Sequence, residues 1–498
     1  MRSTFHGLEV AKRGMFTQQT AISVTGHNIS NANTPGYTRQ RVNFQSTQPY
    51  PSPGMNRPQI PGQMGTGVEA GSIQRVRESF LDDQFRGENN KLGYWQTKSS
   101  AVSKMEDILN EPSKNGLSAV MGQFWQSLQD LSTNPENEGA RSVVLQRAKA
   151  IADTFHYLHN SISAIQNDLG NQISVTVKEV NSILKQISSI NQQISEIEPH
   201  GYLPNDLYDA RDQLVDQLSQ YMNIKVEKVE TGGNAQKIAE GTYKISLVNA
   251  DGSEVPLIDG DQFNQIGVEG GTDSDKDGIL DQPAGALTNF KIVTPGTPPT
   301  DVTSVGIGSF SQGKLKALGE SYGYTEGGVT KGLYPEMLAN LDKLAKDFVE
   351  AFNDQNKLGK DFDGKDGVDF FTGTDAATIS VAITETSKIA ASANGDKGNG
   401  SNALKLADVQ MSTVVKPYEG IIGALGVEGS EARRMTKNSA ILAQSVETNR
   451  QSISSVSLDE EMTDLIRFQH AYNAAARNIT VVDEMLDKII NGMGTVGR

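Results

Sequence analysis

The sequence predicts a multidomain α+β protein: a long helical bundle with N- and C-terminal coiled-coil helices and an inserted, mostly β domain. Apolar residues recur at helical spacing near both ends of the chain, which predicts the coiled-coil helices. Near residue 223 the hydrophobic period shortens from about 3.6 residues to 2, which predicts the inserted strands. In chain order we expect an N-terminal helix with an extended segment (1–95), a helical bundle (96–222) and a β outer domain (223–333). A helix returning to the bundle (334–358), a Gly/Asp-rich insertion (359–401) and C-terminal helices (402–498) follow.

The composition favours long amphipathic helices and exposed β surface over one thick core. Hydrophobic types make up 36% of the 498 residues, and the mean hydropathy is -0.43. The net charge of -15 disfavours nucleic acid or an anionic membrane as a partner, because both would repel the average surface. The chain has no cysteine, which excludes disulfides, zinc thiolates and thiol catalysis. No apolar run suits a secretory signal or a membrane span, so we expect no membrane insertion.

The first predicted helix covers residues 4–31 and ends in a corner. Gln18 and Gln19 interrupt its apolar stripe, which consists of Phe5, Leu8, Ala11, Met15, Ile22 and Ile29. After the helix, Pro35 and Gly36 fit the two central positions of a type II turn. An isolated helix of this kind would fray, so we expect it to pair with the other end of the chain or with neighbouring subunits.

The middle of the chain begins with an extended segment and continues as helices. Prolines in residues 50–67 forbid a helix, and a short strand is expected near residues 68–76. Apolar stripes then predict helices that pack in a local bundle, at residues 117–131, 143–158 and 162–197. A further helix over residues 207–222 carries charged residues that we expect to face outward, namely Asp206, Asp209, Arg211 and Asp212.

Beyond the predicted strands, the chain returns to the bundle and ends in a second long seam. Phe370 and Phe371 are the expected anchor of the Gly/Asp-rich insertion. Ser457 with Glu460 resembles a capping box, and Gly492 is placed as a C-cap. Such a helix would be roughly 50 Å long and needs a partner. Its seam contains Leu458, Met462, Leu465, Gln469, Tyr472, Ala476, Ile479, Leu486 and Ile490.

Two groups of residues are weak candidates for metal binding. The first matches the opening positions of an EF-hand calcium loop, with carboxylates at Asp273, Asp275, Asp277 and Asp281. Ala284 stands where that loop requires a bidentate Glu, so an Asp/Gly turn on a β hairpin is the alternative. The second group is His156 and His159, with Asp153 as a further ligand; a structural or solvated pair is the alternative.

The sequence contains no motif to which we can assign catalytic residues. GxSxG, HExxH, P-loop and dinucleotide-binding fingerprints are absent from a fitting context. Glu460 and Glu461 are neighbours on one helix and point apart, so they cannot act as a glycosidase acid and base. We therefore expect a protein without catalytic residues or a cofactor.

Two motifs near the chain ends resemble the flagellar rod and hook protein family. One is Asn-Ala-Asn-Thr-Pro-Gly-Tyr at residues 31–37, directly after the N-terminal helix. The other lies in residues 460–474 and contains Glu-Glu-Met, Leu465, Phe468-Gln469 and Tyr-Asn-Ala. Rod and hook proteins of this pattern are mostly shorter, whereas the length and the long helical segment resemble a hook–filament junction component.

This resemblance implies a structural role on the bacterial flagellum. The implied partners are further copies of the chain in a ring or tube, the hook protein, a second hook–filament junction protein and an export chaperone at the C-terminal region. The implied location is extracellular, at the hook–filament junction, reached by type III export without a cleaved signal peptide. The hook-facing element would contain Asn31, Asn33, Pro35, Gly36 and Tyr37, and the tube and chaperone contacts would include Leu458, Met462, Leu465, Gln469, Tyr472, Ile479 and Leu486.

The apolar stripes at the two ends also suggest how assembly is driven. Burial of apolar surface contributes about 25 cal/mol per Å², and for these helices it becomes available on assembly. We therefore expect termini that are disordered in the free protein and ordered in the ring. Two alternatives remain: another hook or distal-rod component of the same family, and a secreted calcium-dependent hydrolase or adhesin that uses the β domain.

Overall fold

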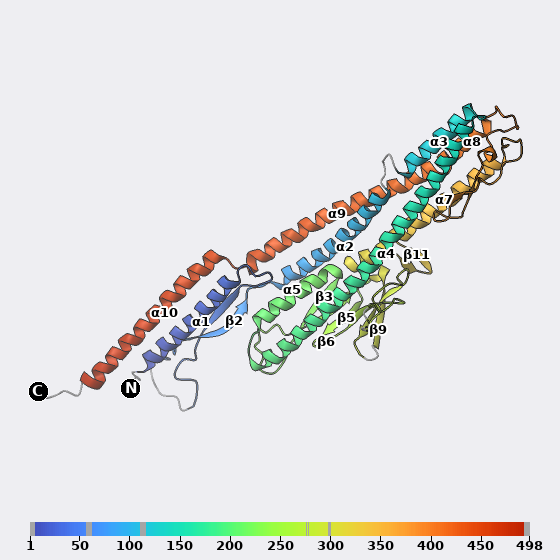
Figure 1. Ribbon diagram of the computed structural model, residues 1–498. Coiled ribbons are helices and arrows are strands. Elements are labelled where there is room, and N and C mark those ends of the chain that lie inside the picture. Colours follow the sequence, from blue (N-terminus) through green and yellow to red (C-terminus); the bar gives the residue numbers. More distant parts are fainter. Residues whose placement is uncertain are drawn as a thin grey trace.

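The protein is an elongated helical body with a pair of terminal helices at one end and a β domain on its flank (Figure 1). This computed structural model describes residues 5–55, 62–109, 116–274, 276, 278–296 and 300–492. The chain termini lie at the same end of the molecule (Figure 1). Long helices with several small antiparallel sheets confirm the predicted α+β class with terminal helices and an inserted β region.

The terminal end of the molecule is built from both ends of the chain. Helix α1 (His6–Asn31) lies antiparallel to α10 (Leu458–Asp487), and the π-helical turn η5 (Lys488–Gly492) follows α10. On another side of α1 packs a hairpin of β1 (Gln40–Ser46) and β2 (Val68–Arg75), with a bulge at Asn43/Phe44. The strand β1 was not predicted, whereas β2 was.

The helical body is a bundle whose longest member spans most of its length. Its members are α2 (Ser79–Leu109), α3 (Leu117–Thr133), α4 (Glu138–Ile197), α5 (Asn205–Tyr221), α7 (Leu333–Lys357), α8 (Ser401–Gln410) and α9 (Lys416–Ser454), with the π-turn η4 (Met411–Val415) before α9. The two helices predicted over 143–158 and 162–197 form the single helix α4, because no Gly or Pro separates their stripes. The predicted boundary between residues 95 and 96 falls inside α2.

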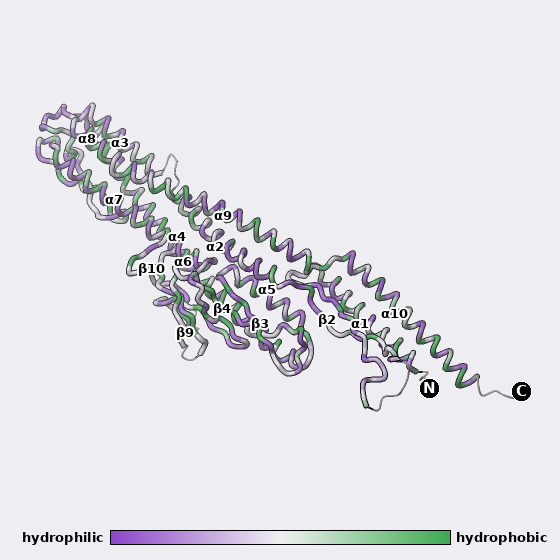
Figure 2. The backbone as a smooth tube through the Cα atoms, turned by 180° about the vertical axis from the view of Figure 1, so that it is seen from behind, coloured by the Kyte–Doolittle hydropathy of each residue, from purple (hydrophilic) through white to green (hydrophobic). Residues whose placement is uncertain are grey.

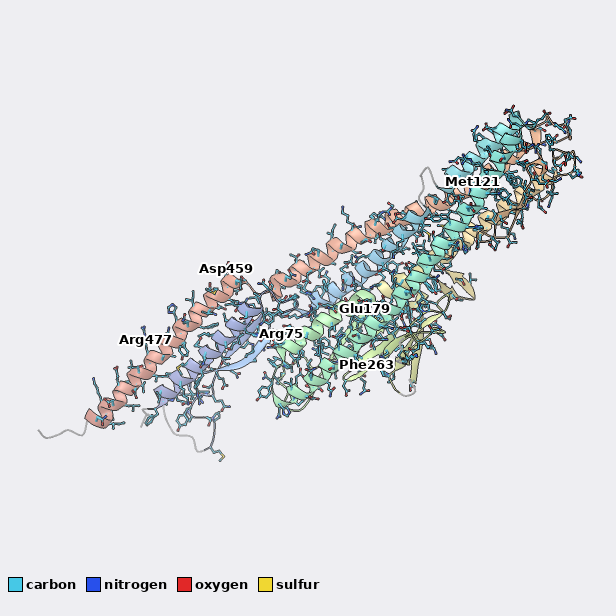
Figure 3. All side chains as sticks on the ribbon, in the orientation of Figure 1. Arg75, Met121, Glu179, Phe263, Asp459 and Arg477 are labelled. Carbon is cyan, nitrogen blue, oxygen red and sulfur yellow. The ribbon has the colours of Figure 1, made fainter. Side chains whose placement is uncertain are left out.

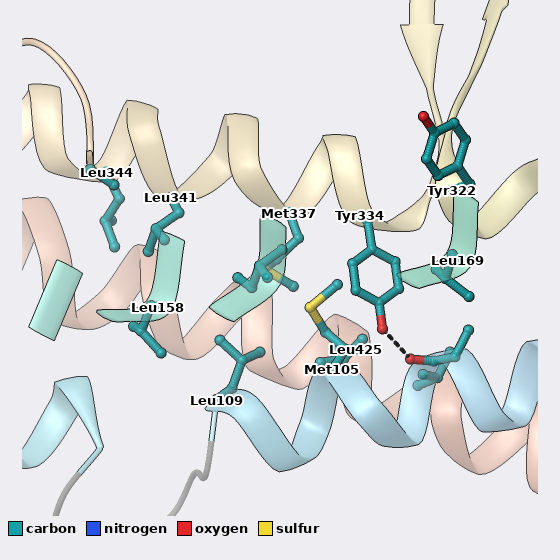
Figure 4. Packing of buried hydrophobic residues seen from close by; sticks show 14 of the residues in the cluster. Met105, Leu109, Leu158, Leu169, Tyr322, Tyr334, Met337, Leu341, Leu344 and Leu425 are labelled. Atoms are coloured by element: carbon teal, nitrogen blue, oxygen red, sulfur yellow. Dashed lines mark hydrogen bonds between the residues drawn. The ribbon is translucent and has the colours of Figure 1, made fainter. Parts of the chain in front are cut away.

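Apolar residues from these helices form one continuous core. Figure 4 shows its middle, where the Tyr334 hydroxyl donates a 3.0 Å hydrogen bond to the Ala101 carbonyl between α7 and α2. Phe370 and Phe371 are fully buried and stack near Phe348 and Phe352. The insertion is therefore anchored to the body as predicted, through an aromatic cluster worth about 0.5–1.5 kcal/mol per ring pair beyond burial.

The β domain consists of two antiparallel sheets laid against α4. One has the order β3 (Ile224–Val229), β4 (Thr242–Val248), β5 (Glu254–Asp259), β6 (Gln262–Phe263); the other has the order β7 (Gln265–Val268), β8 (Asn289–Thr294), β9 (Thr300–Gly306). The Asn191 amide of α4 donates a 2.9 Å bond to the Tyr243 carbonyl, which ties the first sheet to the helix. Shorter elements complete the fold: η1 (Glu198–His200), η2 (Ile307–Ser309), α6 (Lys314–Tyr322), β10 (Tyr324–Glu326), β11 (Val329–Lys331), β12 (Phe371–Thr372), β13 (Ser380–Val381) and η3 (Thr386–Lys388).

Candidate assembly site

The inner face of α10 packs along α1. Buried or half-buried residues recur on α10 at alternating steps of four and three, namely Glu461, Leu465, Phe468, Tyr472, Ala475, Ile479, Val482 and Leu486. This is the heptad spacing of a coiled coil. The contact with α1 therefore covers one side of α10 within a single chain. The core here is small: Ala21, Val24 and Val42 are buried, with Ile73 and Phe468 partly buried against them.

A second apolar row on α10 remains exposed. Its residues, which we name the outer row, are about half exposed: Leu458 50%, Met462 50%, Ile466 50%, Val481 51% and Met485 52%. Within each half of the row the residues are four apart, so they form ridges on the helix surface. In the second view of the molecule, hydrophobic segments also appear along α10 (Figure 2). A helix that is apolar on two sides has a second surface available for another helix.

The predicted interface residues therefore lie on two different faces. Leu465, Tyr472, Ile479 and Leu486 belong to the half-buried face that packs on α1, whereas Leu458, Met462 and Gln469 are exposed. Of the predicted stripe, Phe5 directly before α1 is exposed, Ala11 is buried, and Leu8, Met15, Ile22 and Ile29 are half-buried. The single seam drawn from the sequence combined these two faces, because steps of three and four do not distinguish neighbouring rows.

The corner after α1 is a tight turn held by one asparagine. Gly36 has φ 80°, and the Tyr37 amide donates a 3.2 Å bond to the Thr34 carbonyl, as a type II turn requires. The Tyr37 hydroxyl donates to Asn28 Oδ1 at 2.8 Å. The buried Asn28 also exchanges two hydrogen bonds with the backbone of Gln40, so it joins the helix end to the start of β1. Of the other corner residues, Asn31 is half-buried, and Asn33 and Pro35 are exposed.

The contacts that hold the start of α10 differ from the predicted capping box. Ser457 is the N-cap, but its side chain makes no capping hydrogen bond in the described part of the chain, so the predicted capping box is wrong. Glu460 instead pairs with Arg39 at 2.9 Å, and the buried Glu461 pairs with Arg39 at 2.6 Å. Helix α10 also continues into a π-helical turn at its other end, so Gly492 is the last residue of that turn rather than a cap after an α-helix.

Where the terminal end meets the body, a cluster of charged side chains is buried. The expectation that Asp209, Arg211 and Asp212 face outward is wrong: their exposed fractions are 6%, 0% and 2%. Figure 3 labels Arg75 at this junction. The charge cluster consists of Arg75, Arg77, Arg86, Arg211, Asp209, Asp212, Asp216 and Glu240, which come from β2, the segment before α2, α2, α5 and the segment before β4.

Asp212 lies at the centre of this cluster. Its carboxylate is 2.9 Å from Arg75 and 3.2 Å from Arg77, and it accepts a 2.9 Å bond from the Tyr243 hydroxyl. Burial favours the neutral acid, but the charges of Arg77 and Arg75 outweigh it and hold the pKa of Asp212 well below its usual value. For Asp209, burial outweighs Arg75, and the pKa is raised. Ionised Asp212 therefore stabilises the junction.

The depressed pKa of Asp212 predicts acid-sensitive stability. In the unfolded chain an Asp has a pKa of about 3.9, so this contribution is fully present above that pH and is lost as the pH falls toward the lower pKa of Asp212 in the folded chain. Asp209 works in the opposite sense, because its folded-state pKa is raised. We therefore predict that the stability difference between the parent and Asp212→Asn shrinks as the pH is lowered below about 4, as measured by urea unfolding. A difference independent of pH from 7 to about 2.5 would contradict the assignment.

The charge cluster was missed because charge was equated with exposure. A signal was available: Asp209, Asp212 and Asp216 recur at steps of three and four, which puts them on one face of α5. Arg75 and Arg77 are two apart, as residues on one face of a strand are. Matching an acidic helix face to a basic strand face would have suggested a buried pairing.

The metal candidates show other contacts. Asp273 accepts from the Lys276 and Gly278 amides at 2.6 and 2.9 Å, and the buried Asp281 accepts from Ser174 of α4 at 2.8 Å. Asp275 and Asp277 lie outside the described residues. His156 and His159 are both half-buried on α4. Across the described ranges, no three His, Asp or Glu side chains are grouped so that they could hold a metal ion.

Comparison with known proteins identifies the family. Residues 102–371 match the profile described as the flagellar hook-associated protein FlgK helical domain. A protein of Bacillus subtilis (strain 168) named flagellar hook-associated protein 1 is 42% identical over 523 residues, with 100% of both chains covered. The chain belongs to the flagellar hook-associated protein 1 family. The family also includes a Salmonella typhimurium relative of the same name, 25% identical with 97% of this chain and 98% of that protein covered.

The ends of the chain and the fold agree with this family. Residues 8–38 match the flagella basal body rod protein profile, and residues 448–492 match the C-terminal profile of the flagellar basal body rod FlgEFG proteins. The solved structure of the flagellar hook junction protein FlgK from Burkholderia pseudomallei matches with a TM-score of 0.57 at 15% identity, covering 75% of this chain and 100% of that one. That likeness shows the fold. Among the helices described, none is long and apolar enough to cross a membrane.

Proposed function

We propose that this protein is a structural subunit of the bacterial flagellum at the junction between hook and filament, assembled through its paired terminal helices. Membership of the flagellar hook-associated protein 1 family supports the location. The observation that carries the mode of assembly is the outer row of α10, which stays exposed after the inner face has packed on α1. The relatives are named flagellar hook-associated protein 1, and an association with the hook favours a structural role without catalysis.

Assembly follows from the chemistry of the outer row. Leu458, Met462 and Ile466 are each about half exposed, so the single chain leaves much of their apolar surface in water. Burying that surface against the terminal helices of a second copy contributes about 25 cal/mol per Å². A head-to-tail contact of this kind between identical subunits closes into a ring or continues as a tube, depending on its rotation.

The turn after α1 is proposed as the hook-facing element. Asn33, Pro35 and Gly36 are exposed there, while Tyr37 and Asn31 hold the turn from inside. Asn28 and the backbone of Gln40 make the turn rigid, so its shape is set before it meets a partner. Contact with a second hook–filament junction protein belongs to the same proposal and would use the other end of the ring.

The outer row also suggests how the subunit is handled before assembly. An exposed apolar helix face promotes aggregation in solution, and a chaperone that covers α10 would prevent it. We include in the proposal an export chaperone at the C-terminal region and passage through the type III channel without a cleaved signal peptide. Neither partner nor route is needed to explain the fold.

The proposal is tested on flagella that lack this protein. Purified full-length chain is added to isolated bare hooks, followed by the second junction protein and flagellin, and filament attachment is counted by electron microscopy. We expect the purified chain to restore attachment. Binding along the hook or distal rod without restored attachment would favour a hook or rod component. Calcium-dependent turnover or glycan binding by a monomer that ignores hooks would favour the secreted hydrolase or adhesin.

A further inference from the structure

The helices α9 and α10 are separated by a short break at residues 455–457. Helix α9 belongs to the body and packs on α2, whereas α10 packs on α1. The direction in which α10 continues from α9 is therefore decided at this break. Ser457 contributes no side-chain cap to either helix in the described structure, so other groups must hold the joint.

Arg39 makes contacts on both sides of the break. Its backbone amide donates a 2.9 Å bond to the carbonyl of Ser454, the last residue of α9. Its guanidinium donates to Glu461 at 2.6 Å and to Glu460 at 2.9 Å, both in the first turns of α10. Its own carbonyl accepts from the Val76 amide at 2.8 Å, which ties it to the segment after β2. One residue thus contacts the end of α9, the start of α10 and the hairpin.

The ion pairs of α10 point to the same residue. Within the part of the chain that the structure describes, each ion pair between α10 and another element involves Arg39, and the third of them reaches Asp464 at 3.9 Å. Glu461 is 2% exposed, and its other oxygen accepts a 3.0 Å bond from Asn28. A buried carboxylate with these two partners joins α10 to both α1 and Arg39. Loss of Arg39 would leave its charge without compensation, and loss of Asn28 would leave one oxygen without a hydrogen bond.

We propose that Arg39 is the positioning residue that sets the angle between α9 and α10, where the terminal helix pair joins the helical body, by clamping the break through Ser454 and Glu461. The inference deepens the proposed function, since the angle decides where the outer row is presented to the next subunit. The fork of the guanidinium matters, because it donates to two carboxylates from fixed positions. A lysine at this position keeps the charge but supplies one flexible donor group, so it holds the angle less firmly.

The angle is measured by double electron–electron resonance on the free, full-length subunit. The chain has no cysteine, so a thiol-reactive spin label attaches only at the cysteines that are introduced. One pair, Ser430→Cys with Asn473→Cys, reports the distance between α9 and α10; a second pair, Ser23→Cys with Asn473→Cys, reports the distance between α1 and α10. All these positions are exposed. Each pair is made in the parent, in Arg39→Ala, in Arg39→Lys and in the control Arg41→Ala, which removes an exposed arginine from β1.

We expect one narrow α9–α10 distance in the parent and in Arg41→Ala, loss of that single peak in Arg39→Ala, and an intermediate width in Arg39→Lys. The α1–α10 distance should stay narrow in all of them, because the packing of α10 along α1 and the bond from Asn28 to Glu461 remain without the guanidinium. An α9–α10 peak that is unchanged in Arg39→Ala would overturn the proposal, and so would broadening of both distances, which would mean that Arg39 holds the pair together. The measurement uses free subunits, so an error in the assembly role would appear in the hook experiment and not here.

Discussion

Replacement of Asp212 by asparagine is expected to lower the free energy of unfolding of the helical body by about 3–5 kcal/mol, the usual cost of breaking a buried ion pair by removing one partner. The side chain keeps its shape, but Arg75, Arg77 and Arg86 lose the carboxylate that they share. Because β2, α2 and α5 meet at this carboxylate, we expect the loss to affect the whole junction rather than one helix.

The matched control for this change is Asp83→Asn. Asp83 also pairs with Arg86, at 3.9 Å, but its side chain is 73% exposed. An exposed pair of this kind contributes at most about 1 kcal/mol. The two variants are compared with the parent by thermal and urea unfolding at neutral pH. Equal, small losses in both variants would show that the charge cluster does not stabilise the junction.

The double substitution Met462→Gln with Ile466→Gln is expected to abolish stable attachment of the subunit to its neighbours. Each side chain has about half of its apolar surface left to bury, worth roughly 1 kcal/mol. Together they would weaken each contact by about 2 kcal/mol, or roughly thirtyfold, and the loss repeats at every contact around a ring. Since both residues are exposed in the single chain, the stability of the free subunit should change little.

A matched pair of substitutions on the helical body tests whether the effect depends on where the apolar side chains lie or only on their removal. Val427 and Ile441 of α9 are exposed by 70% and 58%, so Val427→Gln with Ile441→Gln removes comparable apolar surface outside the terminal helices. Binding of all three proteins to bare hooks is measured by sedimentation and electron microscopy. If the α9 variant failed to bind while the α10 variant bound normally, the assembly surface would have to be assigned to the helical body instead of α10.

Much of this architecture is predictable from the sequence, because it depends on periodicity. The long stripe over 162–197, the change of period at 223 and the paired stripes at both ends each follow from one repeated spacing. The Pro35-Gly36 turn was predictable for a different reason, since a positive φ is easily adopted by glycine and the structure has φ 80° at Gly36.

What could not be predicted depends on contacts between distant residues. Ser457 with Glu460 had the sequence of a capping box, but Arg39, far away in the chain, pairs with the Glu460 carboxylate that such a box would use. Asp209 and Asp212 were assigned to the surface because a single helix does not show that Arg75 and Arg77 lie opposite it. The outer row was merged with the inner seam for a similar reason. The two faces of α10 differ only in that α1 covers one of them, and the sequence of α10 alone does not show where α1 lies.

The central claim is that the terminal helix pair forms in the free subunit but opens readily there, and that neighbouring copies stabilise it. Hydrogen exchange of the full-length chain, free and bound in rings on isolated hooks, tests it most directly. The account predicts that α1 and α10 exchange much faster than α2 and α9 in the free subunit, because few apolar residues are fully buried between them, and that they become strongly protected in the ring. Equal, slow exchange of all four helices in the free subunit, with no change on assembly, would contradict the account.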